Sequence, residues 1–148
     1  MAVGAVIAGL TGVVLLQVWL GIIGGDWWVN AAVLTLAVGA VGATVAGLGA
    51  LFGEAGIGLG ALTMILLGNP LSGAASAPEL LSQPWGTIGQ ALPPGAGATL
   101  LRSTAFFDGA GAAGPLWTLL GWWLFGGGLL VVGWPAGTTD HSPCRLRR

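Results

Sequence analysis

The chain has very little charge. Only 6% of its 148 residues are Asp, Glu, Lys or Arg, against about 25% in ordinary soluble domains. Within residues 1–78 only Asp26 and Glu54 are charged, and residues 109–139 carry no charge at all. A soluble fold of this length could not bury so much apolar surface. The sequence therefore predicts an integral membrane protein that crosses the bilayer several times.

Other absences each exclude a class of function. The chain has no lysine, so it has no phosphate-binding loop of the Gly-x-x-x-x-Gly-Lys-Ser/Thr type, and any ATPase must be a separate chain. Cys144 is the only cysteine, which excludes an internal disulfide and a cysteine-based zinc site. A net charge of −1 gives no basic surface for nucleic acid. We expect no metal, no cofactor and no nucleic-acid partner.

The acidic residues are placed unlike those of an enzyme or a proton relay. Asp26 and Glu54 lie at turns between apolar segments, where a carboxylate stays hydrated. A proton relay needs acids inside the spans, and the sequence shows no acid–base pair and no nucleophile beside a base. We expect no enzymatic activity.

Four long apolar segments make up most of the chain. A helix needs roughly 20 apolar residues to cross the hydrocarbon core. The segments must be helices, because they lack the alternation of a transmembrane barrel. We predict an all-α polytopic helix bundle, with a single transmembrane domain over residues 1–134 and a tail at 135–148. The predicted spans cover about residues 2–24, 28–52, 55–77 and 115–134.

The placement of arginine sets the expected orientation. Three of the four arginines lie within residues 145–148, and cytoplasmic segments of membrane proteins collect Arg and Lys. We therefore expect a multi-pass protein of the cell inner (cytoplasmic) membrane with its C-terminus in the cytoplasm. An even number of spans puts the N-terminus there too. The Asp26 turn and residues 78–114 are then outside, and the Glu54 turn is inside.

Small residues repeat at helical spacing on two of the predicted spans. Gly39, Ala43 and Gly47 recur every four residues on the second span, and Gly21 and Gly25 share this spacing on the first. Small residues let helix backbones approach closely in lipid. We expect these positions to pack helices within one subunit; the alternative is a dimer face.

Asn69 and Pro70 interrupt the third predicted span. Pro70 has no backbone N–H, so the carbonyl of Leu66 loses its helical partner and the helix kinks or ends. The small, weakly polar residues that follow are tolerated at membrane depth only when they are buried in protein or face a water-filled cavity. Two interpretations stay open: a break that lines a path, or a kink that neighbouring spans satisfy.

Residues 79–108 are too apolar for a free loop and too interrupted for one span. Apolar residues at 81, 85, 88 and 92 fall on one helical face. Pro93-Pro94-Gly95 breaks the chain, and a second short helix is expected over 96–107. We predict an outer, re-entrant helical hairpin over about 79–108. The alternative is a pair of interfacial helices without a transport role.

Arg102 is the only cation of this hairpin. A long cationic side chain keeps its charge wet by reaching along apolar surface. We expect Arg102 to snorkel to water or phosphate in this way, or to pair with Glu79 or Asp108.

A longer stretch carries a resemblance to a known family. Three spans, the break at Asn69 and Pro70, the run Gln-Pro-Trp-Gly-Thr-Ile-Gly-Gln-Ala-Leu-Pro-Pro-Gly-Ala-Gly-Ala-Thr-Leu-Leu-Arg at 83–102 and a last span resemble the C-terminal membrane half of type-2 ABC exporter permeases, in the phage-infection-protein-like branch. In those permeases a short helix leads to a leucine–proline turn and a second short helix that ends near an arginine. The Leu-Pro-Pro run at 92–94 and the Leu-Leu-Arg run at 100–102 match this layout.

The resemblance implies a membrane subunit, or partial subunit, of an ABC-type export permease. It implies a separate ATPase, a second permease half or a second copy of the chain, and a lipid or other amphipathic substrate in an apolar path. It assigns Asn69 and Pro70 to a hinge. It assigns the outer gate to Trp85, Pro93, Pro94 and Arg102.

The chain also departs from that family. A complete permease of this type has six spans, and four are predicted here. The N-terminal pair that is missing includes the cytoplasmic coupling helix that docks on the ATPase, and the large outer domain of the branch is missing too. The alternative function is a non-transporting membrane scaffold or assembly protein of the cell envelope.

Overall fold

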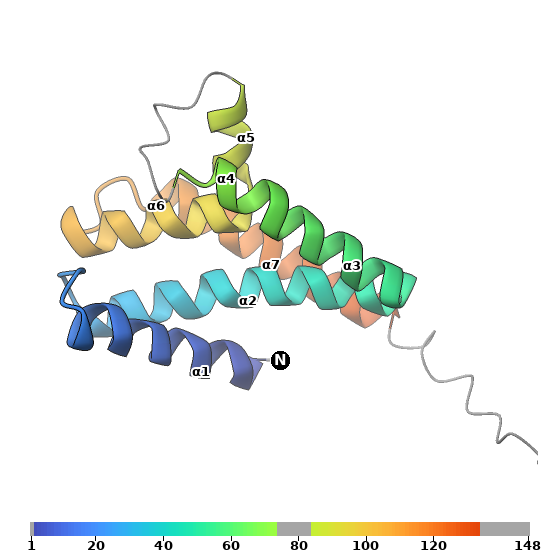
Figure 1. Cartoon of the computed structure of the whole chain (residues 1–148), viewed down its shortest axis with the longest axis horizontal. Coiled ribbons are helices and arrows are strands. Elements are labelled where there is room, and N and C mark those ends of the chain that lie inside the picture. Colours follow the sequence, from blue (N-terminus) through green and yellow to red (C-terminus); the bar gives the residue numbers. More distant parts are fainter. Residues whose placement is uncertain (1, 74–83, 134–148) are drawn as a thin grey trace, which may run out of the picture.

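The structure, a computed structural model, describes residues 2–73 and 84–133 (Figure 1). Every regular element in these two stretches is a helix. Four long helices are apolar enough to span a membrane, which confirms the predicted all-α bundle. They run over Ala2–Trp19 (α1 and η1), Trp27–Phe52 (α2), Glu54–Leu71 (α3, η2 and α4) and Ala113–Gly133 (α7).

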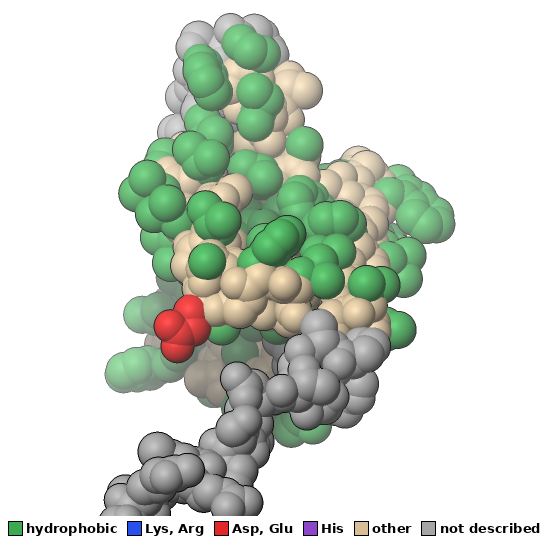
Figure 2. Space-filling view, turned by 90° about the vertical axis from the view of Figure 1, so that its right-hand side faces the viewer, with side chains coloured by type: hydrophobic (Ala, Val, Ile, Leu, Met, Phe, Trp, Pro, Cys, Tyr) green, Lys and Arg blue, Asp and Glu red, His purple; other side chains and the backbone are tan. Residues whose placement is uncertain are grey.

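Hydrophobic side chains cover most of the described surface in Figure 2. Large apolar residues are exposed on all four long helices, among them Val3, Trp28, Leu66 and Val131. Water-soluble monomers rarely expose apolar surface this extensive, whereas the hydrocarbon of a bilayer solvates such a surface. The protein is therefore embedded in a membrane. The C-terminal arginines lie outside the described residues, so the choice of membrane and the direction of insertion stay predictions.

The first helix is shorter than predicted. α1 (Ala2–Val13) continues as the π-helical segment η1 (Val14–Trp19) and ends there, before the predicted end at 24. Gly21 and Gly25 lie in the loop that follows, with φ of 61° and 80°, a conformation that costs glycine nothing. Their predicted seam on a helix is wrong. The loop is apolar, and apolar composition alone does not distinguish it from the helix before it.

α2 is the central helix of the bundle. Asp26 caps its N-terminus, because one carboxylate oxygen accepts hydrogen bonds from the backbone N–H groups of Trp28 at 2.9 Å and Val29 at 3.1 Å. These are donors that a helix start leaves unpaired. Gly53, with φ of 62°, ends the helix. Each of the other long helices packs against α2.

α7 runs parallel to α2 along a seam of small residues (Figure 1). Gly39 faces the indole ring of Trp123, and a Cβ on Gly47 would lie 2.6 Å from the carbonyl oxygen of Gly126. Gly126 in turn abuts the backbone of Ala43. The predicted seam of Gly39, Ala43 and Gly47 therefore packs two helices within one subunit, as expected.

The third long helix is irregular. It consists of α3 (Glu54–Leu62), the π-helical η2 (Thr63–Gly68) and α4 (Asn69–Leu71). It ends one residue after Pro70, which confirms the predicted kink or end at this proline. A wide π-helical turn lies directly before the proline, where the ring would clash with the Leu66 carbonyl in a regular α-helix. The helix ends at Leu71, short of the predicted 77, because Ser72 and Gly73 form a turn with φ of 65° at Gly73; residues 74–77 lie outside the described residues.

Two short helices, α5 (Trp85–Ala91) and α6 (Pro93–Phe106), occupy the predicted hairpin. Leu92 between them is extended, with φ of −90° and ψ of 148°, because a residue before proline avoids the helical region. Pro93 and Pro94 open α6, since the fixed φ of proline suits a first helical turn. The predicted Pro-Pro-Gly turn is therefore wrong, and the second helix starts three residues before the predicted 96.

One side of α2 is covered by two elements that are distant in the sequence. A Cβ on Gly60 of α3 would lie 3.2 Å from the Cα of Val45, and a Cβ on Gly97 of α6 would lie 2.8 Å from the Cβ of Ala37. The third helix thus covers the C-terminal half of α2, and α6 covers the N-terminal half (Figure 1). A core between α2, α6 and α7 consists of Val33, Ala40, Ala96, Leu100 and Leu119. The depth of α6 in the bilayer, and with it the re-entrant hairpin, stays a prediction.

Candidate functional site

The end of the third helix meets the start of α6. A Cβ on Gly68 would lie 2.7 Å from the ring Cγ of Pro94, so this approach needs glycine. Asn69 and Pro70, the predicted hinge, follow directly and are exposed, whereas Pro93 is fully buried. The predicted hinge therefore lies next to two predicted gate prolines. We call this meeting point the junction; it comprises residues 68–73, residues 89–94, Thr99 and Arg102.

Backbone contacts at the junction also require glycine. A Cβ on Gly89 would meet the carbonyl group of Leu71, and a Cβ on Gly95 would meet the carbonyl group of Gly89. α4, α5 and α6 therefore touch backbone to backbone. Interiors packed this closely have low compressibility and transmit strain.

Side-chain hydrogen bonds hold the junction together. Gln90 Nε2 donates to the carbonyl of Ser72 at 3.1 Å, and the Thr99 hydroxyl donates to Gln90 Oε1 at 2.6 Å. The buried Ser72 hydroxyl donates to the carbonyl of Asn69 at 2.7 Å. These bonds satisfy backbone carbonyls that the end of a helix leaves open, which is a requirement for backbone at membrane depth.

Arg102 reaches the junction from α6. Its Nη2 atom donates to the carbonyl oxygen of Gly73 at 3.2 Å, and the side chain is partly buried. Asp108 lies beyond the end of α6 and lines another cleft together with Asp26. The expected pairing with Asp108 is therefore not formed, because the guanidinium turns toward the third helix instead. The other expected partner, Glu79, lies outside the described residues.

Trp85 is not part of the junction. It begins α5, at the end of that helix far from α6, and its side chain is 53% exposed. The structure thus separates this predicted gate residue from the others. The residues that it brings together are Asn69, Pro70, Pro93, Pro94 and Arg102.

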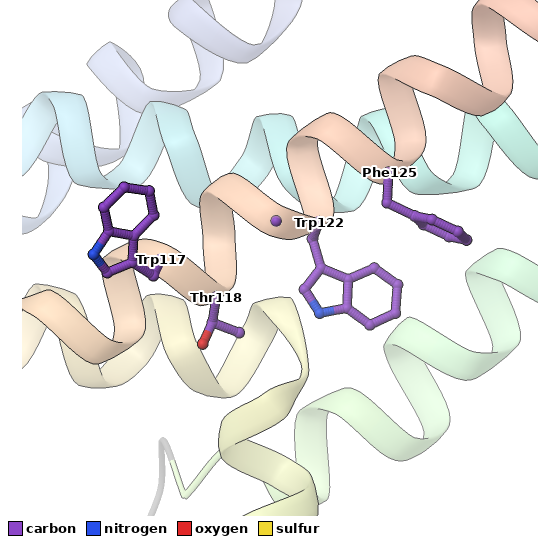
Figure 3. Close-up of a pocket in the computed structure, with 5 residues that line it drawn as sticks. Trp117, Thr118, Trp122 and Phe125 are labelled. Atoms are coloured by element: carbon purple, nitrogen blue, oxygen red, sulfur yellow. The ribbon is translucent and has the colours of Figure 1, made fainter.

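A groove of about 380 Å³ runs along one face of α7 (Figure 3). Its lining is almost wholly apolar and consists of Trp117, Thr118, Gly121, Trp122 and Phe125. The rings of Trp122 and Phe125 meet edge to face, with centroids 5.8 Å apart. Trp122 Nε1 also donates to the carbonyl of Ala91 at 2.7 Å, which links the groove to the end of α5.

A buried polar cluster centres on Asn30, a residue that the sequence analysis did not single out. Asn30 is 0% exposed. Its Nδ2 atom donates to the carbonyl of Gly24 at 2.7 Å and to Gln17 Oε1 at 3.2 Å, and its Oδ1 atom accepts from the Thr104 hydroxyl at 2.9 Å. The cluster ties η1, the first loop and α6 to α2. The sequence carried one indication of this cluster, because the amide side chains of Gln17 and Asn30 lie on the two predicted spans on either side of the Asp26 turn.

The junction lies wholly within the described residues. It contains no carboxylate, thiol or imidazole group. No group of three or more His, Cys, Asp or Glu residues in the two described stretches could hold a metal ion. No family model, curated protein or solved structure matches the chain. The resemblance to export permeases therefore rests on the sequence motifs alone.

Proposed function

We propose that the chain is an integral membrane subunit, or partial subunit, of an ABC-type export permease that moves a lipid or another amphipathic substrate with a separate ATPase. The observation that carries the proposal is the junction. A long helix that ends just after Pro70 rests on Pro94, one of the two prolines that open α6. In the resembling permeases, too, two short helices lie between the last two spans, as α5 and α6 lie between the third helix and α7 here.

In this proposal Asn69 and Pro70 form the hinge, and α5 and α6 form the outer gate. The third helix begins at Glu54, in a turn that we expect on the cytoplasmic side, where an ATPase can act on it. The contact of Gly68 with Pro94 and the hydrogen bond from Gln90 to Ser72 carry a tilt of this helix to the hairpin. Packed elements of this kind switch between discrete arrangements, so a small shift at one end opens or closes the other.

The groove on α7 supports an amphipathic substrate. Its aromatic lining matches hydrocarbon, and its only hydroxyl, that of Thr118, already donates to the carbonyl of Gly114 at 3.1 Å. Pockets select polar ligands through a few polar groups with free hydrogen-bonding capacity. An ion or a sugar would find little of that capacity in this groove, whereas an acyl chain needs none.

Export also needs partners. In the resembling permeases two membrane units enclose the path, so we propose a homodimer or a complex with a second permease half. ATP hydrolysis belongs to a separate chain, because a phosphate-binding loop needs a lysine and this chain has none.

A gentle-detergent pull-down of the native protein, followed by mass spectrometry, tests this function. An ATP-binding partner that copurifies in proportion to the chain supports it. A stable complex with cell-envelope proteins and no ATPase contradicts it and favours the scaffold or assembly protein. Membranes from cells that lack the chain, solubilised in the same way, provide the control.

A further inference from the structure

Arg102 is the only arginine or lysine in residues 1–144, and two contacts of α6 fix its level in the bundle. Gly97 packs against Ala37, and the Thr104 hydroxyl donates to Asn30 Oδ1 at 2.9 Å. Both partners belong to α2, so Arg102 lies beside the stretch between them. At 1.5 Å per residue, this level is roughly 5–10 Å inside the N-terminal end of α2.

The guanidinium points along α6 toward the N-terminal end of that helix. Helical side chains tilt toward the N-terminus of their own helix, and the hydrogen bond from Arg102 Nη2 to Gly73 shows this tilt. Gly73 follows the third helix, whose Gly68 packs against Pro94 at the start of α6. Arg102 therefore does not snorkel toward the nearer end of α2, and its charge is held at the junction.

Within residues 2–73 and 84–133, most of the donors of Arg102 have no partner. A guanidinium carries five N–H donors, and one hydrogen bond uses them here. Within the described residues no carboxylate pairs with Arg102, and the neighbouring Gln90 and Thr99 are bonded to each other. A charge inside a membrane protein marks a functional site and needs a partner. An anion would supply the negative charge and the acceptors that the described residues do not supply.

We propose that Arg102 binds a phosphate group at the junction, and that this group is the headgroup of an anionic lipid. The planar fork of a guanidinium matches the oxygens of a phosphate in a bidentate manner. The apolar groove on α7 lies next to the junction, because Trp122 bonds the carbonyl of Ala91, the residue after Gln90. A lipid held by its phosphate at Arg102 thus has apolar surface beside it for an acyl chain. The idea that this lipid is the exported substrate rests on the proposed function. The idea that the lipid binds at Arg102 does not, and it can be tested without a transport assay.

Native mass spectrometry of the full chain in mild detergent, with equimolar phosphatidylglycerol and phosphatidylcholine, measures this binding. We expect the wild-type chain to retain phosphatidylglycerol preferentially, and Arg102→Gln to lower that preference roughly tenfold, the value of a strong charged hydrogen bond. Arg102→Lys keeps the charge without the fork and should retain part of the preference. Arg145→Gln removes the same charge from the tail and should retain most of it.

Several outcomes would overturn the proposal: no preference in the wild-type chain, an unchanged preference in Arg102→Gln, or an equal loss in Arg145→Gln. The wild-type result stands by itself if Arg102→Gln does not fold. Excess inorganic phosphate, compared with chloride of the same ionic strength, identifies the source of the phosphate group. Displacement of the lipid shows a site for free phosphate and overturns the lipid assignment; retention of the lipid supports it. A lipid preference without any ATPase partner would support the site while the proposed export function fails.

Discussion

At the scale of single residues, Asn30 connects more of the chain than any other polar side chain described above. Its amide bonds η1, the first loop and α6 to α2. Buried amides of this kind stabilise a structure chiefly because the groups left behind by their removal would be unsatisfied.

Asn30→Leu tests the cluster. The substitution leaves Gln17 Oε1 and the Gly24 carbonyl without the amide donor of Asn30, and it leaves the Thr104 hydroxyl only its bond to the Leu101 carbonyl. We therefore expect the free energy of unfolding to fall by about 1–3 kcal/mol. Unfolding of the purified protein in a mixed detergent and SDS titration gives this value. Asn69→Leu is the matched control, because Asn69 is exposed, and its stability should stay near that of the wild type. Equal stabilities of the two variants would contradict a structural role of the cluster.

Gly126→Ala tests the seam between α2 and α7. The new methyl group would meet the backbone of Ala43 and lie 2.5 Å from the Thr44 nitrogen. We expect a loss of about 1–3 kcal/mol, the usual cost of overpacking. Gly128, two residues along the same helix, has open space around its Cβ position. Gly128→Ala should therefore be neutral, or stabilising by up to about 1 kcal/mol through helix propensity; a similar loss in both variants would disprove the seam.

Residue-scale features differ in how far the sequence reveals them. Pro70 lacks its N–H wherever it stands, so the interruption of the third helix at this residue follows from the sequence, although the span was predicted to reach 77. Asn30 instead depends on Thr104, which is 74 residues away in the sequence. Arg102 depends on Gly73, which is 29 residues away. No local pattern indicates which distant group such a side chain meets, and the expected pairing of Arg102 with Asp108 failed for this reason.

At the scale of elements, the third helix and the hairpin work as a unit in the proposed function. Pro70→Ala restores a helical N–H and removes the ring clash, so the helix can continue past the junction. We expect transport by the intact system to fall several-fold while the amount of protein in the membrane is unchanged. A transport assay with membrane vesicles, normalised by immunoblot, measures this. Unchanged transport would remove Asn69 and Pro70 from the hinge.

Pro115→Ala is the control for this experiment. Pro115 lies in the first turn of α7, where a helix has no partner for the N–H and proline is well tolerated. Its replacement should leave transport unchanged. A loss as large as that of Pro70→Ala would show that the assay responds to any proline substitution rather than to the hinge.

Helix positions follow from the sequence where apolar length and breakers agree. The second span, predicted over 28–52, is found at Trp27–Phe52, and the fourth, predicted over 115–134, at Ala113–Gly133. The predicted end of the first span was wrong because the loop after Trp19 is as apolar as the helix, and only the backbone conformation of its glycines separates the two. The predicted start of the second short helix was wrong, because a pair of prolines can begin a helix as well as end one.

At the scale of the whole molecule, the central position of α2 and its contact with α7 needed the structure. Hydropathy predicts how many helices cross a membrane but not which of them touch. The interlocking contacts of Gly39, Gly47 and Gly126 establish that arrangement. The orientation in the membrane, by contrast, rests on the tail arginines and is open to direct measurement.

The single cysteine of the chain allows that measurement without further engineering. We expect Cys144 to be protected from a membrane-impermeant maleimide in intact cells, or in spheroplasts where an outer membrane is present, and to be labelled once the membrane is opened. A Cys144→Ser, Leu20→Cys variant should behave in the opposite way, because Leu20 lies in the loop before Asp26, which we place outside. Labelling of Cys144 in the intact preparation would reverse the whole topology.

The coverage of one side of α2 by the third helix and α6 also has a consequence for synthesis of the protein. α6 has 14 residues, which at 1.5 Å each is about 21 Å and too short to cross a bilayer unaided. It is held by α2, made long before it, and by α7, made directly after it. Because α7 follows α6 in the chain, α6 gains the second of these two packing partners only after α7 has been synthesised.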